Sequence, residues 1–408
     1  MNFLQAKDYI EELNIKGSIL GLENMQRIME ALNNPQDDLS FIHVSGTNGK
    51  GSVCAYVSEC LINAGYRVGI YTSPVVFEYL EKIRVGHRNI SQKDFADIIS
   101  KIKDAATKNN IPITAFEAET AAALLYFAKK DCDLVVLETG LGGESDATNI
   151  VNTTILSIFT SISLDHVGIL GKTVSQIALV KSGIIKKNSM AVSSVASDEV
   201  KEVLKAKAEK MNSPITFIDG NEADKFKLSM KGEHQKINAS LALVAINKLK
   251  EAGFDIYDAD IKNALEKTKL PGRMEIISKR PLFIIDGAHN VDAARHLRDT
   301  LLKLYPDKKK LFIMGMFSDK DYEGVINQTA DLAEYIITLK TPVASRALSA
   351  YDLAKAVALI NKNVSTADSV EEAVEMAKLL NPGMIVAFGS LSYLGHLKEI
   401  IKDKKNGR

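Results

Sequence analysis

Residues 41–64 constrain the fold most, because they join an apolar stretch, a glycine-rich turn and a helical pattern. The stretch Phe41-Ile-His-Val-Ser45 is apolar and β-branched, which is typical of a buried parallel strand. It continues into Gly46-Thr-Asn-Gly-Lys-Gly-Ser52, and residues 53–64 follow with a helical pattern. This order is typical of phosphate binding, because glycines let backbone N–H groups converge on an anion and a helix N-terminus adds partial positive charge.

The glycine-rich turn predicts a nucleotide site made of Gly46, Thr47, Asn48, Gly49, Lys50, Gly51 and Ser52. Lys50 would bind the β- and γ-phosphates, and Ser52 would offer its hydroxyl to Mg²⁺. The spacing is not that of a standard Walker A motif, since only Thr47 and Asn48 separate the first glycine from Gly49-Lys50. A glycine turn without chemical function is the alternative; the strand before it and the helix after it favour phosphate.

The bulk composition narrows the class of partner. The 51 basic and 51 acidic side chains cancel, which argues against a large nucleic-acid-binding surface. The three cysteines, Cys54, Cys60 and Cys132, have no metal or disulfide spacing and fit a reduced compartment. The N-terminus is charged, and no apolar run approaches the ~18 residues of a membrane span. We expect a cytoplasmic protein that binds neither nucleic acid nor membranes.

The rest of the chain alternates strands and helices, which indicates a parallel sheet covered on both faces. Strands are predicted at 67–71, 134–138 and 154–159, with a loop through Val85. Alternation restarts after Pro271-Gly-Arg273. We therefore predict an α/β protein with an N-terminal P-loop ATP-binding domain, residues 1–270, and a smaller open α/β domain, residues 271–408. A ligand is expected in the cleft between two such domains.

Polar side chains follow several predicted strands at their carboxyl ends, where open α/β sheets bind ligands. They are Ser52, Ser73, Glu138 and the His166 of Leu164-Asp-His166. A hydroxyl, a carboxylate and an imidazole beside a triphosphate can complete a Mg²⁺ shell. Each residue alone is as well explained as a cap, a turn residue or a solvated side chain. Their shared sheet edge is what favours a metal site.

The order of motifs resembles that of the folylpolyglutamate synthase/dihydrofolate synthase family, a branch of the Mur ligase superfamily. The resemblance covers nearly the whole chain and implies a Mur-ligase-type ATPase domain followed by a Rossmann-like glutamate-ligase domain. It rests on Asn34-Pro35, His43 to Ser52, Thr72-Ser-Pro74, Glu138 to Gly143, Asp146-Ala-Thr-Asn149, Leu164-Asp-His166, Lys181-Ser-Gly-Ile184, His234-Gln235, Asn238-Ala239, Pro271-Gly-Arg273 and Asp286-Gly-Ala-His-Asn290.

The resemblance implies an amide ligase that uses ATP and two Mg²⁺ ions. ATP phosphorylates a carboxylate of dihydropteroate or a folate, and the amine of L-glutamate attacks the acyl phosphate. A monomer is expected. Two alternatives stay open: a ligase of the same superfamily acting on a different acid, and a nucleotide-binding relative that no longer catalyses.

The resemblance also implies residue roles. Lys50 and Ser52 contact phosphate and Mg²⁺, while Ser73, Glu138 and His166 are metal ligands. Lys181 would be carbamylated and hold the second Mg²⁺; without the resemblance it is an ordinary lysine at a helix end.

Further roles are implied for the second half of the chain. Asn238, Arg273 and Asp286 match residues that contact nucleotide or sit near the glutamate, and His289 and Ser390 match residues at the amino-acid end. Catalytic roles are expected for Lys50, Lys181, Asp286 and His289. Phe116 opens a helix that borders the pterin site in the family, although a core phenylalanine is an equal explanation.

Three positions depart from the family pattern. Glu144 stands where arginine is usual, Val75 where histidine is usual, and Val180 where glutamate is usual. The phosphate and metal residues are intact, so we expect ATP–Mg²⁺ binding to be kept. The departures instead place the identity of the acceptor acid in doubt.

Overall fold

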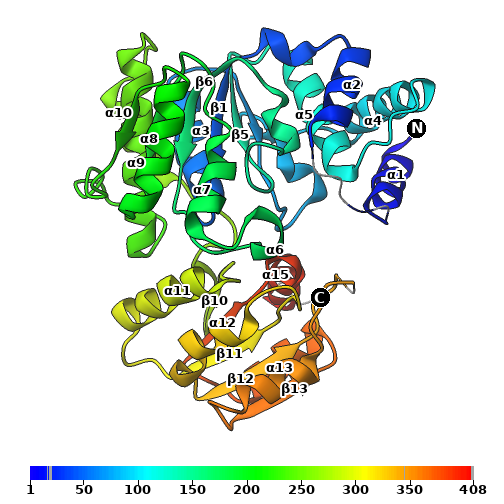
Figure 1. The fold of residues 1–408 in the computed structure, drawn as a ribbon. Coiled ribbons are helices and arrows are strands. Elements are labelled where there is room, and N and C mark those ends of the chain that lie inside the picture. The colour runs from blue at the N-terminus through cyan, green and yellow to red at the C-terminus, as the bar shows by residue number, and fades with distance from the viewer. Residues whose placement is uncertain (16, 18–20, 344, 406–408) are drawn as a thin grey trace. The chain divides into compact units, whose positions relative to one another are not determined.

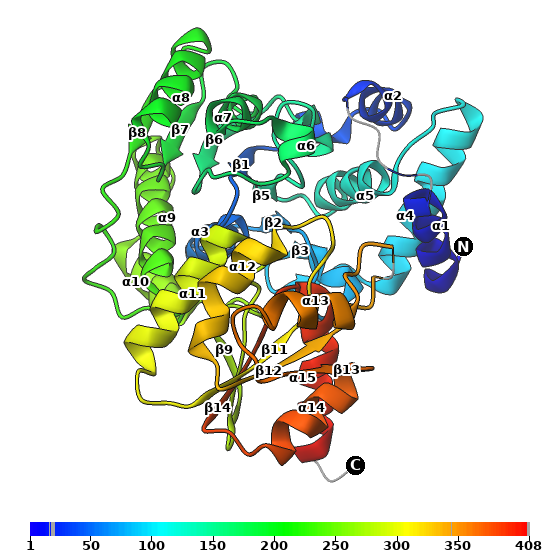
Figure 2. The ribbon, with the colours of Figure 1, turned by 60° about the horizontal axis from the view of Figure 1, so that its bottom comes forward.

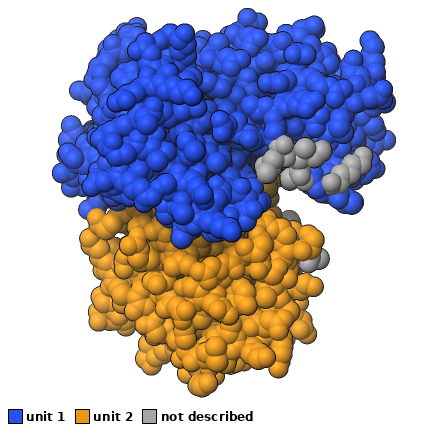
Figure 3. Space-filling model, in the orientation of Figure 1, with its two compact units in different colours: residues 1–74, 80–229, 236–268 blue, residues 75–79, 230–235, 269–408 orange. Residues whose placement is uncertain are grey.

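The computed structural model describes residues 1–15, 17, 21–343 and 345–405. Contacts divide the chain into two compact units (Figure 3). Unit 1 comprises residues 1–74, 80–229 and 236–268, and unit 2 comprises residues 75–79, 230–235 and 269–408. Within the described residues, no helix is long and apolar enough to cross a membrane.

Unit 1 is built on an eight-stranded sheet in the order β4-β3-β2-β5-β1-β6-β7-β8 (Figures 1 and 2). Six of its strands pair in parallel: β1 (Phe41–Ser45), β2 (Val68–Tyr71), β5 (Leu134–Glu138), β6 (Thr154–Phe159), β7 (Met190–Ser193) and β8 (Ile215–Phe217). The central strands β1 and β5 are buried at every residue, which explains their continuous apolar sequence.

The loop predicted through Val85 is wrong over its last three residues, which form the strand β3 (Ile83–Val85). β3 pairs antiparallel with β2 and with the next strand, β4 (Arg88–Asn89). The sheet is therefore mixed rather than parallel throughout. Both strands are very short and mostly half-exposed, so no apolar alternation marks them in the sequence.

Helices cover both faces of this sheet. Helix α3 contacts β1, β2 and β5. The Phe127 ring of α5 lies against Gly69 of β2, where a Cβ would come within 2.8 Å of the ring. The helices of unit 1 are α1 (Phe3–Ile15), α2 (Glu23–Ala31), α3 (Lys50–Asn63), α4 (Gln92–Lys108), α5 (Ala115–Lys129), α6 (Val167–Leu170), α7 (Val174–Ser182), α8 (Asp198–Lys210), α10 (Asp258–Lys267) and all but the first turn of α9 (Glu233–Glu251), with short 3₁₀ turns at Pro35–Asp38, Tyr79–Lys82 and Ala147–Ile150.

Unit 2 has a six-stranded sheet in the order β13-β12-β11-β14-β10-β9. Only β9 runs antiparallel to its neighbour β10; the other pairs are parallel. The strands are β9 (Glu275–Lys279), β10 (Leu282–Ile285), β11 (Lys310–Met314), β12 (Tyr335–Leu339), β13 (Val364–Ala367) and β14 (Met384–Phe388). The edge strands β9 and β13 were not predicted.

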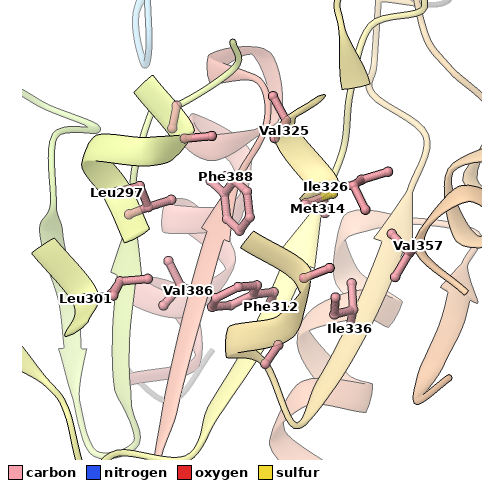
Figure 4. Packing of buried hydrophobic residues seen from close by; sticks show 14 of the residues in the cluster. Leu297, Leu301, Phe312, Met314, Val325, Ile326, Ile336, Val357, Val386 and Phe388 are labelled. Atoms are coloured by element: carbon pink, nitrogen blue, oxygen red, sulfur yellow. The ribbon is translucent and has the colours of Figure 1, made fainter. Parts of the chain in front are cut away.

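The core of unit 2 confirms a small α/β layer structure. Leu297 and Leu301 of α11 pack with Phe312, Val386 and Phe388 on one face of the sheet (Figure 4). That face is covered by α11 (Val291–Leu304), α12 (Tyr322–Thr329) and α13 (Ala350–Val357). A second buried cluster joins the opposite face to α14 (Val370–Leu379) and α15 (Leu391–Lys405), and a 3₁₀ turn spans Ala330–Leu332.

Candidate active site

The phosphate loop of unit 1 has the backbone that its glycines predict. Gly46 and Gly49 have φ angles of 153° and 92°, and Gly49 directly precedes α3. A Cβ on Gly49 would come within 2.5 Å of Asn238 Oδ1, so the predicted nucleotide residue Asn238 lies against this loop. Thr47 donates its N–H to Ser161 O at 2.7 Å, which fixes the loop to the segment after β6.

The predicted phosphate ligands lie at the start of α3. Lys50 Nζ donates to Gly46 O and Thr47 O, both at 3.2 Å. Ser52 is buried in the first turn of the same helix. The N-terminus of a helix of 14 residues therefore faces the loop, which is the arrangement that attracts phosphate.

Lys181 of α7 lies on the same loop. Its side chain is buried, and Nζ donates to Gly46 O at 2.8 Å. Burial and, to a smaller extent, the like charge of Lys50 lower the pKa of Lys181 from 10.5 to about 7, while the charges of Asp165 and Asp146 oppose that fall. A large share of the Lys181 amines is therefore neutral near neutral pH, which an ordinary lysine is not.

Glu138 and Ser73 are brought together at the carboxyl ends of β5 and β2. Ser73 donates its backbone N–H to Glu138 Oε2 at 3.1 Å, and Glu138 is buried. His166 caps α6 with a φ of 50°, and its N–H donates to Asp165 Oδ1 at 2.9 Å.

The chemistry of the predicted metal ligands decides whether they could hold Mg²⁺. A buried carboxylate and hydroxyls suit a hard cation. Across the described part of the chain, no three His, Cys, Asp or Glu side chains cluster as a metal site. Besides Glu138 the predicted set relies on Ser52, Ser73, His166 and Lys181, and Lys181 can contribute only when it is not an ammonium.

A buried polar network that the site predictions omitted joins these parts. Thr148 Oγ1 donates to Asp146 Oδ1 at 2.5 Å, and Asp146 Oδ2 accepts the Leu141 N–H at 2.6 Å. Because that hydroxyl proton is used, His43 Nε2 donates to Thr148 Oγ1 at 2.9 Å. Burial lowers the pKa of His43 to about 3 and raises that of Asp146.

The same network reaches both the loop and Lys181. Ser45 Oγ donates to Gly142 O at 2.7 Å. A Cβ on Gly143 would come within 2.6 Å of Lys181 O, so residues 141–148 are packed against the strand of the phosphate loop and against α7. The polar side chains His43 and Ser45 alternate within an apolar strand, which was the available sequence signal.

In unit 2, Asp286 is a buried acid held by backbone donors. Its Oδ2 accepts the Met274 N–H at 2.8 Å and its Oδ1 accepts the Ala288 N–H at 2.9 Å. Burial raises the pKa of Asp286, while the charge of Arg273 opposes that rise. A Cβ on Gly287, the residue after Asp286, would come within 1.9 Å of Arg273 Nη1, so the two predicted nucleotide residues Arg273 and Asp286 are neighbours.

His289 and Ser390 lie where the unit 2 sheet favours a ligand. Adjacent strands β10 and β14 are followed by helices on opposite faces, and open α/β sheets bind ligands at the carboxyl ends of strands with this topology. The two loops are joined there, because Gly389 N donates to Ala288 O at 2.9 Å. His289 Nδ1 donates to Gly287 O at 2.8 Å, so in the neutral form of the ring Nε2 is the nitrogen that carries no proton.

Two family models match the chain. The Mur ligase middle domain matches residues 44–277, and the glutamate ligase domain of Mur ligases matches residues 272–391. Among solved structures, Escherichia coli FolC in complex with DHPP and ADP has a TM-score of 0.88 at 28% identity, covering 99% of each chain. A Thermotoga maritima folylpolyglutamate synthase has a TM-score of 0.83 at 29% identity, covering 98% of this chain and 97% of that one.

Curated relatives agree with these matches. The dihydrofolate synthase/folylpolyglutamate synthase of Bacillus subtilis is 32% identical over 414 residues, which covers 94% of this chain and 95% of the relative. The Escherichia coli protein of the same name is 30% identical, covering 98% and 95%. The resemblance seen in the motifs is thereby confirmed, and the chain belongs to the folylpolyglutamate synthase/dihydrofolate synthase family of ATP-dependent Mur-type ligases.

Proposed function

We propose that this enzyme joins L-glutamate to a carboxylate of a folate or of dihydropteroate through an acyl phosphate. The carboxylate oxygen attacks the γ-phosphorus of ATP and ADP leaves; the glutamate amine then attacks the acyl carbon and phosphate leaves. The supporting observation is the contact of Lys181 with the phosphate loop, since it brings a lysine of lowered pKa to Gly46 O at 2.8 Å. Little covalent chemistry falls to the protein, so positioning and charge supply most of the rate.

We assign nucleotide binding to the phosphate loop together with Asn238, Arg273 and Asp286. Support comes from solved relatives, since the Mycobacterium tuberculosis synthase was solved with ADP and AMPPCP. Ser52, Ser73, Glu138 and His166 would hold Mg²⁺, which supplies positive charge to the phosphate oxygens when it is bound. Residues 1–270 would form the ATP-binding domain and residues 271–408 the glutamate-ligase domain.

We assign Lys181 as the residue that becomes carbamylated. Carbamylation forms an N–C bond between the amine and CO₂ and releases a proton, so it requires the neutral amine. The lowered pKa of Lys181 provides that form near pH 7. The product is an anion in the place of a buried cation, and it would hold the second Mg²⁺.

We assign the amino-acid end of the reaction to His289 and Ser390. An amine nucleophile must give up a proton as the amide forms. His289 Nε2 is the imine nitrogen of a ring whose orientation is fixed by Gly287 O, so it suits that acceptor role. Phe116 would border the pterin ring. We expect the enzyme to act as a cytoplasmic monomer on small molecules.

The test is ADP release measured with glutamate under four conditions: with dihydropteroate, with tetrahydrofolate, with an unrelated carboxylic acid such as a peptide, and with no acceptor. Release that depends on either pterin acid supports the proposal. Release only with another carboxylic acid would identify a ligase of different substrate. Tight ATP binding without release under any acceptor would identify a nucleotide-binding relative, the alternative that Glu144 and Val180 suggest.

A further inference from the structure

Residues 75–79, which we call the crossing segment, fold with unit 2, although the residues on both sides of them in the chain belong to unit 1. Val76 and Phe77 pack against the buried cluster that joins α14 and α15 to one face of the unit 2 sheet. The chain therefore leaves unit 1 directly after Ser73-Pro74 and is held at once by residues of unit 2.

Gly395 of α15 leaves room for the crossing segment. Glycine is less favourable than alanine in the interior of a helix, so a glycine within the 15 residues of α15 needs an explanation. A Cβ on Gly395 would lie 2.2 Å from Val76 O and 3.2 Å from Cδ1 of Phe77. Because the nearer atom belongs to the backbone, any side chain at this position would displace the crossing segment from α15.

Lys398, three residues after Gly395 on the same helix, holds the crossing segment by its charge. Its Nζ lies 4.0 Å from the centroid of the Phe77 ring, which is within the range of a cation–π interaction. The same ammonium donates to Glu275 Oε1 at 2.5 Å, and Glu275 Oε2 accepts the Gly272 N–H at 3.0 Å. The Lys398 side chain is 17% exposed, so these contacts are largely shielded from solvent.

The chain links the crossing segment closely to Ser73. Only Pro74 separates the two, and the ring of a proline fixes its φ angle. Val76 is three residues beyond Ser73, so their Cα atoms can lie at most about 11 Å apart. Ser73 in turn donates its N–H to Glu138 Oε2 at 3.1 Å. A displacement of Val76 is therefore expected to reach the pair Ser73 and Glu138 through a short, stiff stretch of backbone.

We propose that Gly395 and Lys398 are positioning residues for Ser73: by holding the crossing segment on α15, they fix the backbone at Ser73 and so direct its hydroxyl toward the Mg²⁺ that accompanies ATP. The inference rests on the proposed function, because it takes Ser73 as a magnesium ligand. Residues that orient a metal ligand change metal affinity about 10–100-fold without touching the ion. Gly395 and Lys398 lie outside the phosphate loop, so the direct contacts of that loop with nucleotide are kept.

The test is calorimetric titration with AMPPCP, carried out once with Mg²⁺ at a fixed concentration and once in EDTA. Gly395→Ala and Lys398→Met should each weaken AMPPCP binding about tenfold in Mg²⁺ and leave binding in EDTA unchanged. Ser73→Ala should show the same selective loss. Adding Gly395→Ala to Ser73→Ala should cost nothing further, because the hydroxyl that Gly395 positions is already gone.

Hydrogen exchange of the backbone amides of residues 75–79, measured without nucleotide, reports whether the crossing segment is held. Exchange should be faster in Gly395→Ala and in Lys398→Met than in the wild type, since both variants remove contacts of this segment. Two controls match the two substitutions. Gly383→Ala is also in unit 2, where a Cβ meets nothing nearer than 3.4 Å, and Lys402→Met changes an exposed lysine one turn later in α15. Both controls should behave like the wild type.

The outcomes separate the inference from the proposed function. Faster exchange with unchanged AMPPCP affinity in Mg²⁺ would overturn the inference, because Gly395 and Lys398 would then serve only packing. Unchanged exchange in both variants, equal losses in Mg²⁺ and EDTA, or a further loss when Gly395→Ala is added to Ser73→Ala would also overturn it. If Ser73→Ala itself binds AMPPCP in Mg²⁺ as tightly as the wild type, the proposed metal role of Ser73 fails, and the inference fails with it.

Discussion

Replacing Lys181 with methionine is expected to stabilise the metal-free protein at pH 7. Lys181 is buried on the phosphate loop, where burial lowers its pKa to about 7 from the ordinary 10.5. That difference corresponds to about 5 kcal/mol between the charged and neutral forms. Methionine is similar in length and carries no charge, so it removes this cost and loses only the hydrogen bond to Gly46 O.

The number of protons bound in the folded and unfolded states decides how the contribution of Lys181 to stability changes with pH. Between pH 7 and 10.5 the unfolded chain keeps a proton on this lysine that the folded chain loses, so this group's contribution to stability rises with pH in that window. Burying Lys181 then lowers the free energy of unfolding by about 4 kcal/mol at pH 7 and by about 1 kcal/mol at pH 10. The gain expected in Lys181→Met is smaller than each value by about 1 kcal/mol, because the variant loses the hydrogen bond to Gly46 O.

The assay is urea unfolding of both proteins in degassed, EDTA-containing buffer, since CO₂ and metal would alter the wild-type site. The difference in free energy of unfolding between the two proteins is taken at pH 7 and again at pH 10, so that the titration of all other groups cancels. The exposed Lys187→Met serves as the control and should change little at either pH. A Lys181→Met protein that is less stable than the wild type at pH 7, or a difference that does not shrink with rising pH, would refute the reasoning.

The remaining predictions concern activity and packing. Gly143→Ala should destabilise unit 1 by about 2 kcal/mol and lower turnover, because its Cβ would come within 2.6 Å of Lys181 O; calorimetry against Gly383→Ala checks this. Asp286→Asn should cost about 1–3 kcal/mol in urea unfolding, because its amide nitrogen cannot accept a backbone N–H. Lys181→Ala should abolish ADP release, with partial rescue by short carboxylates but not by bicarbonate. Glu144→Arg should retain turnover on folate; its loss would indicate a different acceptor.

The sequence predicted the buried strands well and the sheet edges poorly. β1, β5 and β6 lie where continuous apolar runs placed them, because these strands are enclosed on both faces. The edge strands β4, β8, β9 and β13 have two to five residues and lack full burial, so their sequences carry neither apolar runs nor clear alternation. Tertiary pairing, not local pattern, decides such strands.

In the candidate site, too, the sequence predicts the local part and misses the long-range contacts. The phosphate loop is local, so one stretch of sequence predicts its glycines, Lys50 and Ser52. The contacts that support it join residues far apart in the chain. Ser45 bonds to a residue 97 positions away, His43 to one 105 away, and Lys181 to one 135 away. No spacing rule reaches that far, so the lowered pKa of Lys181 became visible only in the folded chain.

The structure also explains how a family member carries Glu144 and Val180. Glu144 is exposed, and its contact with α7 is made by the backbone, through its N–H to Val180 O at 2.8 Å. The Val180 side chain lies beside Gly142, where a Cβ would meet it at 3.1 Å. Neither side chain belongs to the His43–Thr148–Asp146 network, and Glu144 is absent from the charges that act on the Lys181 pKa. Reversing the charge at residue 144 therefore leaves this buried network in place, and we expect any effect of Glu144 on the charged molecules that approach the loop from solvent, ATP as well as the acceptor acid.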